Sequence, residues 1–132
     1  LIKDLPIIKS TLRLDSLLSL SGGETVDIKK LQDQPIAAFS GIANPKDFRR
    51  LLEQSGARVV CYHPFPDHHE YNLSDLKYIE DSAIKSGAKI ILTTEKDAVK
   101  IKPNSISLPF YKVALEMEIL EGREVFNQQI LN

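Results

Sequence analysis

Short apolar runs without alternation occur three times along the chain, and each is followed by a loop and a stretch with helical spacing. The runs are PIAAFS at 35–40, ARVVCY at 57–62 and KIILTT at 89–94. Unbroken apolar runs of this length are typical of strands buried on both faces of a sheet. The repeated order of strand, loop and helix predicts an α/β fold with three layers, in which helices flank a mainly parallel sheet with right-handed crossovers.

The helices between these strands carry start and stop signals. Asn44 suits the N-cap of the first helix and Pro45 its first position, and Ser74 is predicted to cap the second helix. Gly56 and Gly87 are expected to end the two helices. Apolar positions three and four residues apart predict one buried face on each helix, formed by Phe48, Leu51 and Leu52 in the first and by Leu76, Ile79 and Ala83 in the second.

Both ends of the chain depart from this pattern. TLRLDSLLSL at 11–20, the turn signal SGG and ETVDI at 24–28 predict a β-hairpin, and we expect residues 1–34 to form an interdomain linker with this hairpin. Residues 35–132 then form the α/β domain. YKVALEMEI at 111–119 alternates strictly, which predicts a half-exposed strand near a sheet edge. A short terminal helix is expected to follow, with Val125, Phe126 and Ile130.

Composition places the chain among ordinary soluble globular proteins. Of its 132 residues, 42% are hydrophobic and 27% charged, with a formal net charge of −1. This balance indicates no broad basic surface, so nucleic acid is not an expected partner. The single cysteine, Cys61, excludes an internal disulfide and is expected to pack in the second strand. Because the chain begins at Leu1 and Met117 is its only methionine, we expect it to be a piece of a longer protein.

The strongest candidate for chemistry is FPDHHEY at 65–71, in the loop after the second strand. Pro64 and Pro66 stiffen this loop, which helps to hold a side chain in place. Asp67 and His68 are candidate catalytic residues, because a carboxylate and an imidazole close together tune each other's proton affinity. A metal site would need three or four converging ligands, whereas adjacent residues of an extended loop point apart. A solvated, turn-rich loop is the remaining alternative.

A second candidate is TTEKDAVK at 93–100, directly after the third strand. Thr94 followed by Asp97 three residues later resembles a capping box, so an ordinary charged first helical turn explains the segment well. A helix N-terminus at the carboxyl edge of a sheet also binds anions, and a lysine there strengthens phosphate binding. Thr94, Glu95, Lys96 and Asp97 are therefore candidates for a nucleotide, phosphate or interdomain contact.

Ligands of open parallel sheets bind beyond the carboxyl ends of the strands. Three loops leave strand ends in this chain, at 41–44, 63–71 and 94–97, and we expect them to open on one edge. Gly41 suits either close approach of a ligand or a tight turn, and we favour the turn. The sequence contains neither G-x-x-x-x-G-K-[ST] nor G-x-G-x-x-G, so the chain alone has no nucleotide-binding loop.

Three motifs in this order resemble the C-terminal half of the tetraacyldisaccharide 4'-kinase family, the lipid A kinases of Gram-negative bacteria. They are AFSGIANPKDF, FPDHHEY followed by the helix start Leu-Ser-Asp-Leu, and ILTTEKDAVK. The resemblance runs from about residue 11 to the end, and the combination is specific although each motif alone is weak. The Asp-His motif of the family corresponds to Asp67 and His68, whereas His69 occupies a variable position.

The resemblance implies a two-domain P-loop kinase at the cytoplasmic face of the bacterial inner membrane. It would transfer the γ-phosphate of ATP, with Mg²⁺, to the 4'-hydroxyl of a glycolipid, tetraacyldisaccharide 1-phosphate. The absent N-terminal domain would contact the membrane, bind ATP and Mg²⁺ and supply a catalytic aspartate, with which the histidine of the Asp-His motif pairs on closure. The chain alone is then expected to be soluble and inactive, without a tightly bound cofactor or metal, and that domain is its partner.

Two other hypotheses stay open at this point. Asp-His-His is also the emblem of a class of manganese phosphoesterases, which need further strand-end aspartates to hold two metals, and only Asp97 is available. The chain would otherwise be a non-catalytic α/β interaction domain, in which FPDHHEY tolerates substitution.

Overall fold

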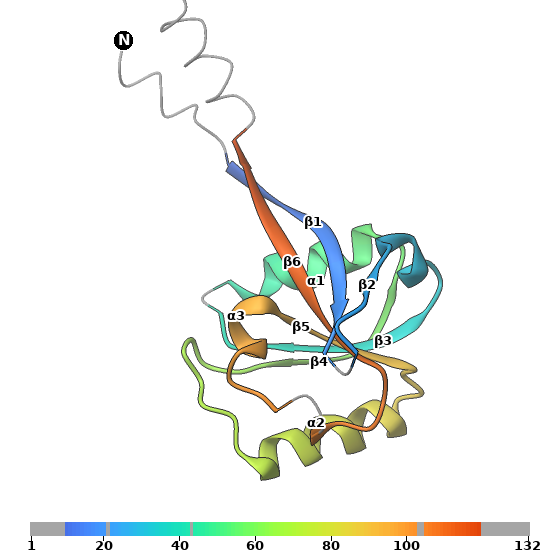
Figure 1. Ribbon diagram of the computed structural model, residues 1–132, viewed down its shortest axis with the longest axis vertical. Helices are drawn as coiled ribbons and strands as arrows, with labels where there is room; N and C mark the ends of the chain where they lie inside the picture. Colours follow the sequence, from blue (N-terminus) through green and yellow to red (C-terminus); the bar gives the residue numbers. More distant parts are fainter. Residues whose placement is uncertain (1–9, 21, 43, 103–104, 120–132) are drawn as a thin grey trace, which may run out of the picture. The chain divides into compact units, whose positions relative to one another are not determined.

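The computed structural model describes residues 10–20, 22–42, 44–102 and 105–119, which contain a six-stranded sheet in the order β2-β1-β6-β5-β3-β4 (Figure 1). The strands are β1 (Ser10–Ser19), β2 (Thr25–Val26), β3 (Pro35–Ser40), β4 (Arg58–Pro64), β5 (Ile90–Thr94) and β6 (Phe110–Ile119). β3 pairs in parallel with β4 and β5, and β5 pairs in parallel with β6. β1 and β2 form an antiparallel hairpin. The mainly parallel α/β sheet and the N-terminal hairpin are thereby confirmed.

Contacts within the chain divide it into two compact units. The larger unit is Leu14–Leu115, and it contains every candidate site residue. Its helices are α1 (Pro45–Gln54), α2 (Leu73–Lys85), α3 (Glu95–Ala98) and the 3-10 helix η2 (Ile28–Leu31). The smaller unit consists of Leu1–Arg13 and Glu116–Asn132, of which the structure describes the strand residues 10–13 and 116–119.

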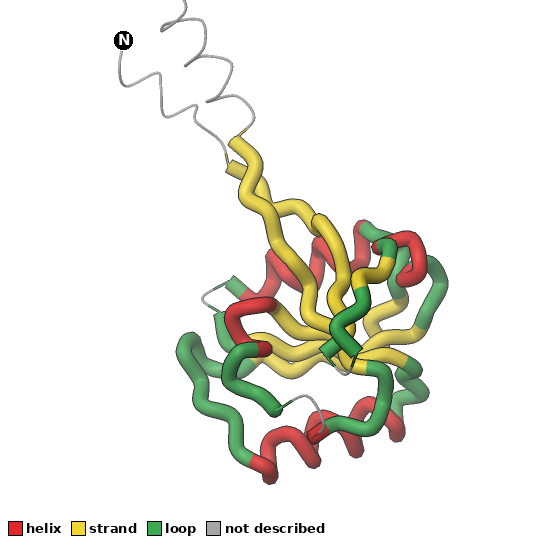
Figure 2. The backbone as a smooth tube through the Cα atoms, in the orientation of Figure 1, coloured by secondary structure: helices red, strands yellow, loops and turns green. Residues whose placement is uncertain are grey.

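Helices cover both faces of the parallel part of the sheet, as the three-layer prediction requires (Figure 2). Successive residues of β3 face opposite layers: Ala37 and Phe39 pack with buried residues of α2, whereas Ile36 and Ala38 pack with those of α1. The fully or nearly fully buried helix residues are Phe48 and Leu52 in α1 and Leu76, Ile79 and Ala83 in α2. The predicted apolar faces are confirmed, with Leu51 only partly buried.

The helix boundaries follow local signals, with one correction. α1 begins at Pro45 after the N-cap residue Asn44, whose side chain makes no capping hydrogen bond. α2 is capped by Asn72 and not by Ser74, because Asn72 and Asp75 form a reciprocal capping box that places Ser74 inside the helix. Gly56 and Gly87 follow the ends of α1 and α2 with positive φ values of 95° and 83°, as expected for residues that end helices.

The prediction that the alternating strand 111–119 lies near a sheet edge is wrong. β6 lies between β5 and β1, with Leu92 opposite Tyr111 on one side and Leu20 N–H donating to Phe110 O at 2.9 Å on the other. Burial is described for residues 111–114 of this strand, where Val113 is buried between the partly exposed Lys112 and Ala114. The hairpin strand β1 lies next to β6 on the side away from β5, where the sequence pattern predicted no neighbouring strand. The edge strands are β4 and β2.

The N-terminal hairpin contributes to the core. Leu17 of β1 pairs with Val26 of β2 and is 1% exposed, in the same apolar cluster as Phe48 and Val113. The division of the chain into a linker at 1–34 and a domain at 35–132 stays a prediction. The terminal helix predicted around 125–130 lies outside the described residues.

Candidate functional site

The three loops at the carboxyl ends of β3, β4 and β5 contact one another, as the parallel topology predicts. The N–H groups of Phe65 and His68, after β4, donate to the carbonyl oxygens of Ser40, the last residue of β3, and Gly41, which follows it, at 2.7 and 3.2 Å. Gly41 N–H in turn donates to Asp97 of α3, which follows β5. These contacts place the candidate residues of FPDHHEY and TTEKDAVK at one edge of the sheet.

Asp97 is the central acceptor of this edge and is fully buried. Its Oδ1 accepts from Tyr71 Oη at 3.0 Å and its Oδ2 accepts from Thr94 Oγ1 at 2.6 Å. Gly41 N–H lies 3.1 Å from each of the two oxygens. Asp97 N–H also donates to Thr94 Oγ1 at 3.1 Å, which confirms Thr94 as the N-cap of α3. The carboxylate therefore joins residues from all three loops.

The phenol of Tyr71 supports this arrangement as a permanent donor. Burial raises the pKa of Tyr71 far above its ordinary value, and the negative charge and hydrogen bond of Asp97 raise it further. The ring packs edge-on against Phe39 and Phe65, with centroid distances of 5.3 and 5.2 Å. Tyr71 is a site residue that sequence reasoning missed, and its only signal was its place at the end of the FPDHHEY motif.

Gly41 is required by space. A Cβ atom on this residue would lie 2.9 Å from Pro66 O and 3.2 Å from both Asp97 Oδ1 and Tyr71 Oη. Its φ is not among the positive values of the described residues, so a left-handed turn is not the reason for glycine here. Close approach of neighbouring loop atoms accounts for the glycine, and the tight turn that we favoured from the sequence stays a prediction.

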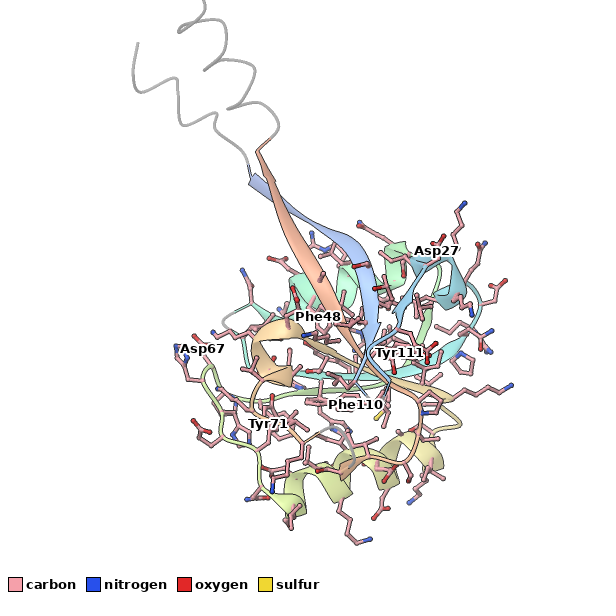
Figure 3. The ribbon with its side chains drawn as sticks, in the orientation of Figure 1. Asp27, Phe48, Asp67, Tyr71, Phe110 and Tyr111 are labelled. Carbon is pink, nitrogen blue, oxygen red and sulfur yellow. The ribbon has the colours of Figure 1, made fainter. Side chains whose placement is uncertain are left out.

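Asp67 and His68 lie on the outer side of the same edge, and Figure 3 shows Asp67 on the loop that follows β4. Lys96 Nζ donates to Asp67 Oδ1 at 3.0 Å, and this hydrogen bond holds the pKa of Asp67 below its ordinary value. His68 Nε2 lies 3.6 Å from Asp67 Oδ2, beyond hydrogen-bond distance. The Asp-His pair is adjacent in space, and the direct partner of its carboxylate is Lys96. The His68 side chain is 74% exposed.

The second histidine of the motif has different surroundings. His69 stacks on Phe65 with a centroid distance of 4.6 Å, and its Nε2 lies 2.9 Å from Asp75 Oδ2. The hydrogen bond from His69 lowers the pKa of Asp75. His69 O accepts from Lys100 Nζ at 3.0 Å. His69 therefore anchors the loop to α2, while His68 faces outward.

The remaining candidates contribute less to this edge. His63 lies in β4 with its Nε2 3.1 Å from Cys61 Sγ, and burial lowers its pKa. Glu95 is exposed at the first position of α3. α3 has only four residues, so its dipole is small, and the contact of Lys96 with phosphate stays a prediction. Within the described ranges, no group of three or more histidine, cysteine, aspartate or glutamate residues is placed to hold a metal ion.

Comparison with known proteins gives a consistent result. A family model described as "Tetraacyldisaccharide-1-P 4'-kinase" matches residues 2–132. Proteins named "Tetraacyldisaccharide 4'-kinase" from Syntrophus aciditrophicus and Anaeromyxobacter dehalogenans are 39% and 35% identical over 120 and 118 residues. These matches cover 90% and 87% of this chain but 32% and 30% of the relatives, so the chain spans about a third of their length.

A solved structure is similar as well. It is a crystal structure of the "apo" form of LpxK from Aquifex aeolicus in complex with ATP, with a TM-score of 0.55 and 25% sequence identity. The match covers 94% of this chain and 35% of that one. A search for membrane-spanning helices among the described residues finds none with the required length and hydropathy.

Proposed function

Because this chain belongs to the tetraacyldisaccharide-1-P 4'-kinase family, we propose that it is the C-terminal part of an ATP-dependent kinase of lipid A biosynthesis. The proposed reaction transfers the γ-phosphate of ATP to the 4'-hydroxyl of tetraacyldisaccharide 1-phosphate. The observation that carries this proposal is the family match over residues 2–132. It favours a kinase over a manganese phosphoesterase or an interaction domain. The chain covers about a third of its relatives, so the remainder of the protein completes the active site.

The proposed roles of the two parts of the kinase follow from the residues present in this chain. The described residues contain no group of histidine, cysteine, aspartate or glutamate side chains suited to a metal ion. We therefore assign the binding of Mg²⁺ and of the ATP phosphates to a P-loop domain in the remaining part of the kinase. The glycolipid substrate and the inner membrane, at its cytoplasmic face, are likewise contacted through that part. This chain contributes Asp67 and His68 at an exposed edge of its sheet.

His68 is the residue best placed to act across a domain interface. Its side chain is 74% exposed, and within the described residues its ring makes no hydrogen bond, so the imidazole is accessible to a group of another domain. In the proposed mechanism it hydrogen-bonds a catalytic aspartate of the P-loop domain, which takes the proton from the attacking sugar hydroxyl. Because His68 and the catalytic aspartate would meet only when the domains close, ATP hydrolysis in the open state would also be limited.

His68→Ala in the full-length kinase tests the proposal. We expect kcat to fall by about 10²–10³, the scale of a lost acid–base partner, with little change in the urea midpoint because the side chain is mostly exposed. Phosphate transfer from radiolabelled ATP to tetraacyldisaccharide 1-phosphate gives kcat. His69→Ala is the matched control. Loss of its contacts with Phe65 and Asp75 should lower the urea midpoint, while kcat of the folded enzyme should change little. A near-wild-type kcat for His68→Ala would refute the proposed role.

A further inference from the structure

We propose that Asp97 is a positioning residue for His68 and acts through the main chain of Gly41. The inference rests on the proposed function, because the position of His68 affects the rate only if His68 takes part in the reaction. It assigns a role to the buried Asp97 carboxylate, whose described hydrogen bonds are to Gly41, Tyr71 and Thr94.

The connection runs through two main-chain groups of one residue. Gly41 N–H donates to the Asp97 carboxylate at 3.1 Å to each oxygen, and Gly41 C=O accepts from His68 N–H at 3.2 Å. Because Gly41 has no Cβ atom, Pro66 O can approach it closely; a Cβ there would lie 2.9 Å from this oxygen. Asp97 therefore fixes the strand end against which the turn carrying His68 is held.

His68 needs such support because its backbone is strained. Its φ is 64°, in the left-handed region that a residue with a Cβ atom adopts only at an energetic cost. His69 N–H donates to Pro66 O at 3.1 Å, which makes His68 the third residue of a β-turn, a position that glycine or asparagine usually takes when φ is positive. The main-chain hydrogen bonds of this turn are the one from His68 N–H to Gly41 O and the one from His69 N–H to Pro66 O, so the conformation of His68 depends on Gly41.

Two successive residues of α3 thus hold the two residues of the Asp-His motif. Lys96 binds the Asp67 side chain at 3.0 Å, and Asp97 holds the His68 main chain through Gly41. This arrangement gives the TTEKDAVK and FPDHHEY segments a joint structural role without requiring that α3 bind phosphate. A displacement of about 1 Å in a reacting group can lower a rate about 10²-fold, so the support has a kinetic consequence.

Asp97→Asn changes the chemistry of this support with little change in shape. The carboxylate accepts from donors on both oxygens, and an amide would turn one of these positions into a donor. The hydroxyls of Tyr71 and Thr94 can rotate and accept, but Gly41 N–H can only donate. We expect the bond to Gly41 to weaken and the His68 turn to shift.

The test is a double-mutant cycle in the full-length kinase, with kcat and KM for ATP measured for wild type, Asp97→Asn, His68→Ala and the double variant. We expect Asp97→Asn to lower kcat about 10- to 100-fold, with KM changed less than about 2-fold. In the His68→Ala background the same substitution should change kcat by less than about 2-fold, because the group that it positions is gone.

The outcomes separate the two proposals. If His68→Ala lowers kcat but Asp97→Asn does not, or if the two effects multiply in the double variant, the positioning role is wrong and the proposed function stands. If His68→Ala leaves kcat unchanged, both are wrong. Leu52→Ala tests whether the loss of activity results from poor folding, because Leu52 belongs to the core cluster on the α1 side and Tyr71 packs against the other cluster. If Leu52→Ala is destabilised as much as Asp97→Asn and loses as much kcat, the positioning role is wrong.

A direct measurement covers the case in which Asp97→Asn folds poorly. Tyr71→Phe removes one donor from Asp97 and keeps the ring. In the full-length kinase labelled with ¹⁵N-histidine, we expect the His68 amide to exchange faster with solvent in Tyr71→Phe. The amide of His63, within the β3–β4 ladder, reports the global loss of stability, and the exchange rate of the His68 amide should rise by a larger factor. Unchanged His68 exchange in both Tyr71→Phe and Asp97→Asn would overturn the inference.

Discussion

The hydroxyl of Tyr71 offers a sharp test of how much the buried carboxylate contributes to stability. Tyr71→Phe removes a single hydrogen bond, from Tyr71 Oη to Asp97 Oδ1 at 3.0 Å. The ring remains and keeps its edge-on contacts with Phe39 and Phe65. The substitution therefore separates the polar contact from the packing of the loop.

The expected magnitude follows from the character of the bond. Hydrogen bonds to charged groups contribute about 1.5–3 kcal/mol, against about 0.5–1.5 kcal/mol for neutral pairs. The phenol is a donor throughout the usual pH range, because burial first and then the Asp97 charge raise the pKa of Tyr71. We expect the free energy of unfolding to fall by about 1.5–3 kcal/mol. With an m-value of about 2 kcal/mol/M, the urea midpoint falls by about 1 M.

Urea unfolding followed by far-UV circular dichroism measures this change, and Tyr78→Phe is the matched control. Tyr78 is 62% exposed, and within the described residues its hydroxyl makes no hydrogen bond, so its removal should change stability by less than about 0.5 kcal/mol. Equal midpoint shifts for the two variants would show that the bond to Asp97 contributes nothing beyond the loss of any tyrosine hydroxyl.

Two further predictions concern Gly41 and His63. Gly41→Ala should lower the free energy of unfolding by about 1–3 kcal/mol, because its Cβ would lie 2.9 Å from Pro66 O, a main-chain atom. Gly22→Ala is the control and should be nearly neutral, because the flexible Glu24 side chain can move away. If thermal unfolding shows Gly22→Ala to be the less stable variant, the steric argument is wrong. Burial lowers the pKa of His63 below 6.5 in the native state. The native state therefore binds fewer protons than the unfolded state as pH falls below 6.5. The stability that His63 contributes above pH 6.5 is lost as pH falls through the native pKa. Urea midpoints at pH 7.5 and 5 should differ less in His63→Gln than in wild type, and an unchanged difference would exclude this contribution.

Local patterns were sufficient for most of the elements. The helix α1 was predicted from Pro45 and Gly56, and the boundary of α2 from Gly87, because capping and left-handed glycines act within a few residues. The cap of α2 was misassigned by two residues because Asn72 and Ser74 are both good capping residues. Only the reciprocal bonds between Asn72 and Asp75 distinguish them.

The candidate site was predicted in position but not in its contacts. Parallel topology alone placed the three strand-end loops at one edge, since all parallel strands end there. The partners were not predictable: Lys96 and Asp67 are 29 residues apart, and Gly41 and Asp97 are 56 residues apart. Their contact depends on the lengths and directions of whole loops, which no short pattern encodes.

By itself, the sequence determined the repeating β-loop-α units, the buried helix faces and the loops that carry the polar motifs. These features depend on hydrophobic periodicity and capping, which operate over one or two turns of chain. The tertiary structure alone decided that β6 lies inside the sheet, that Asp97 is buried among donors from three loops, and that His68 is held in a left-handed conformation. Each of these results from pairing between distant segments, whose stability comes from packing the whole unit.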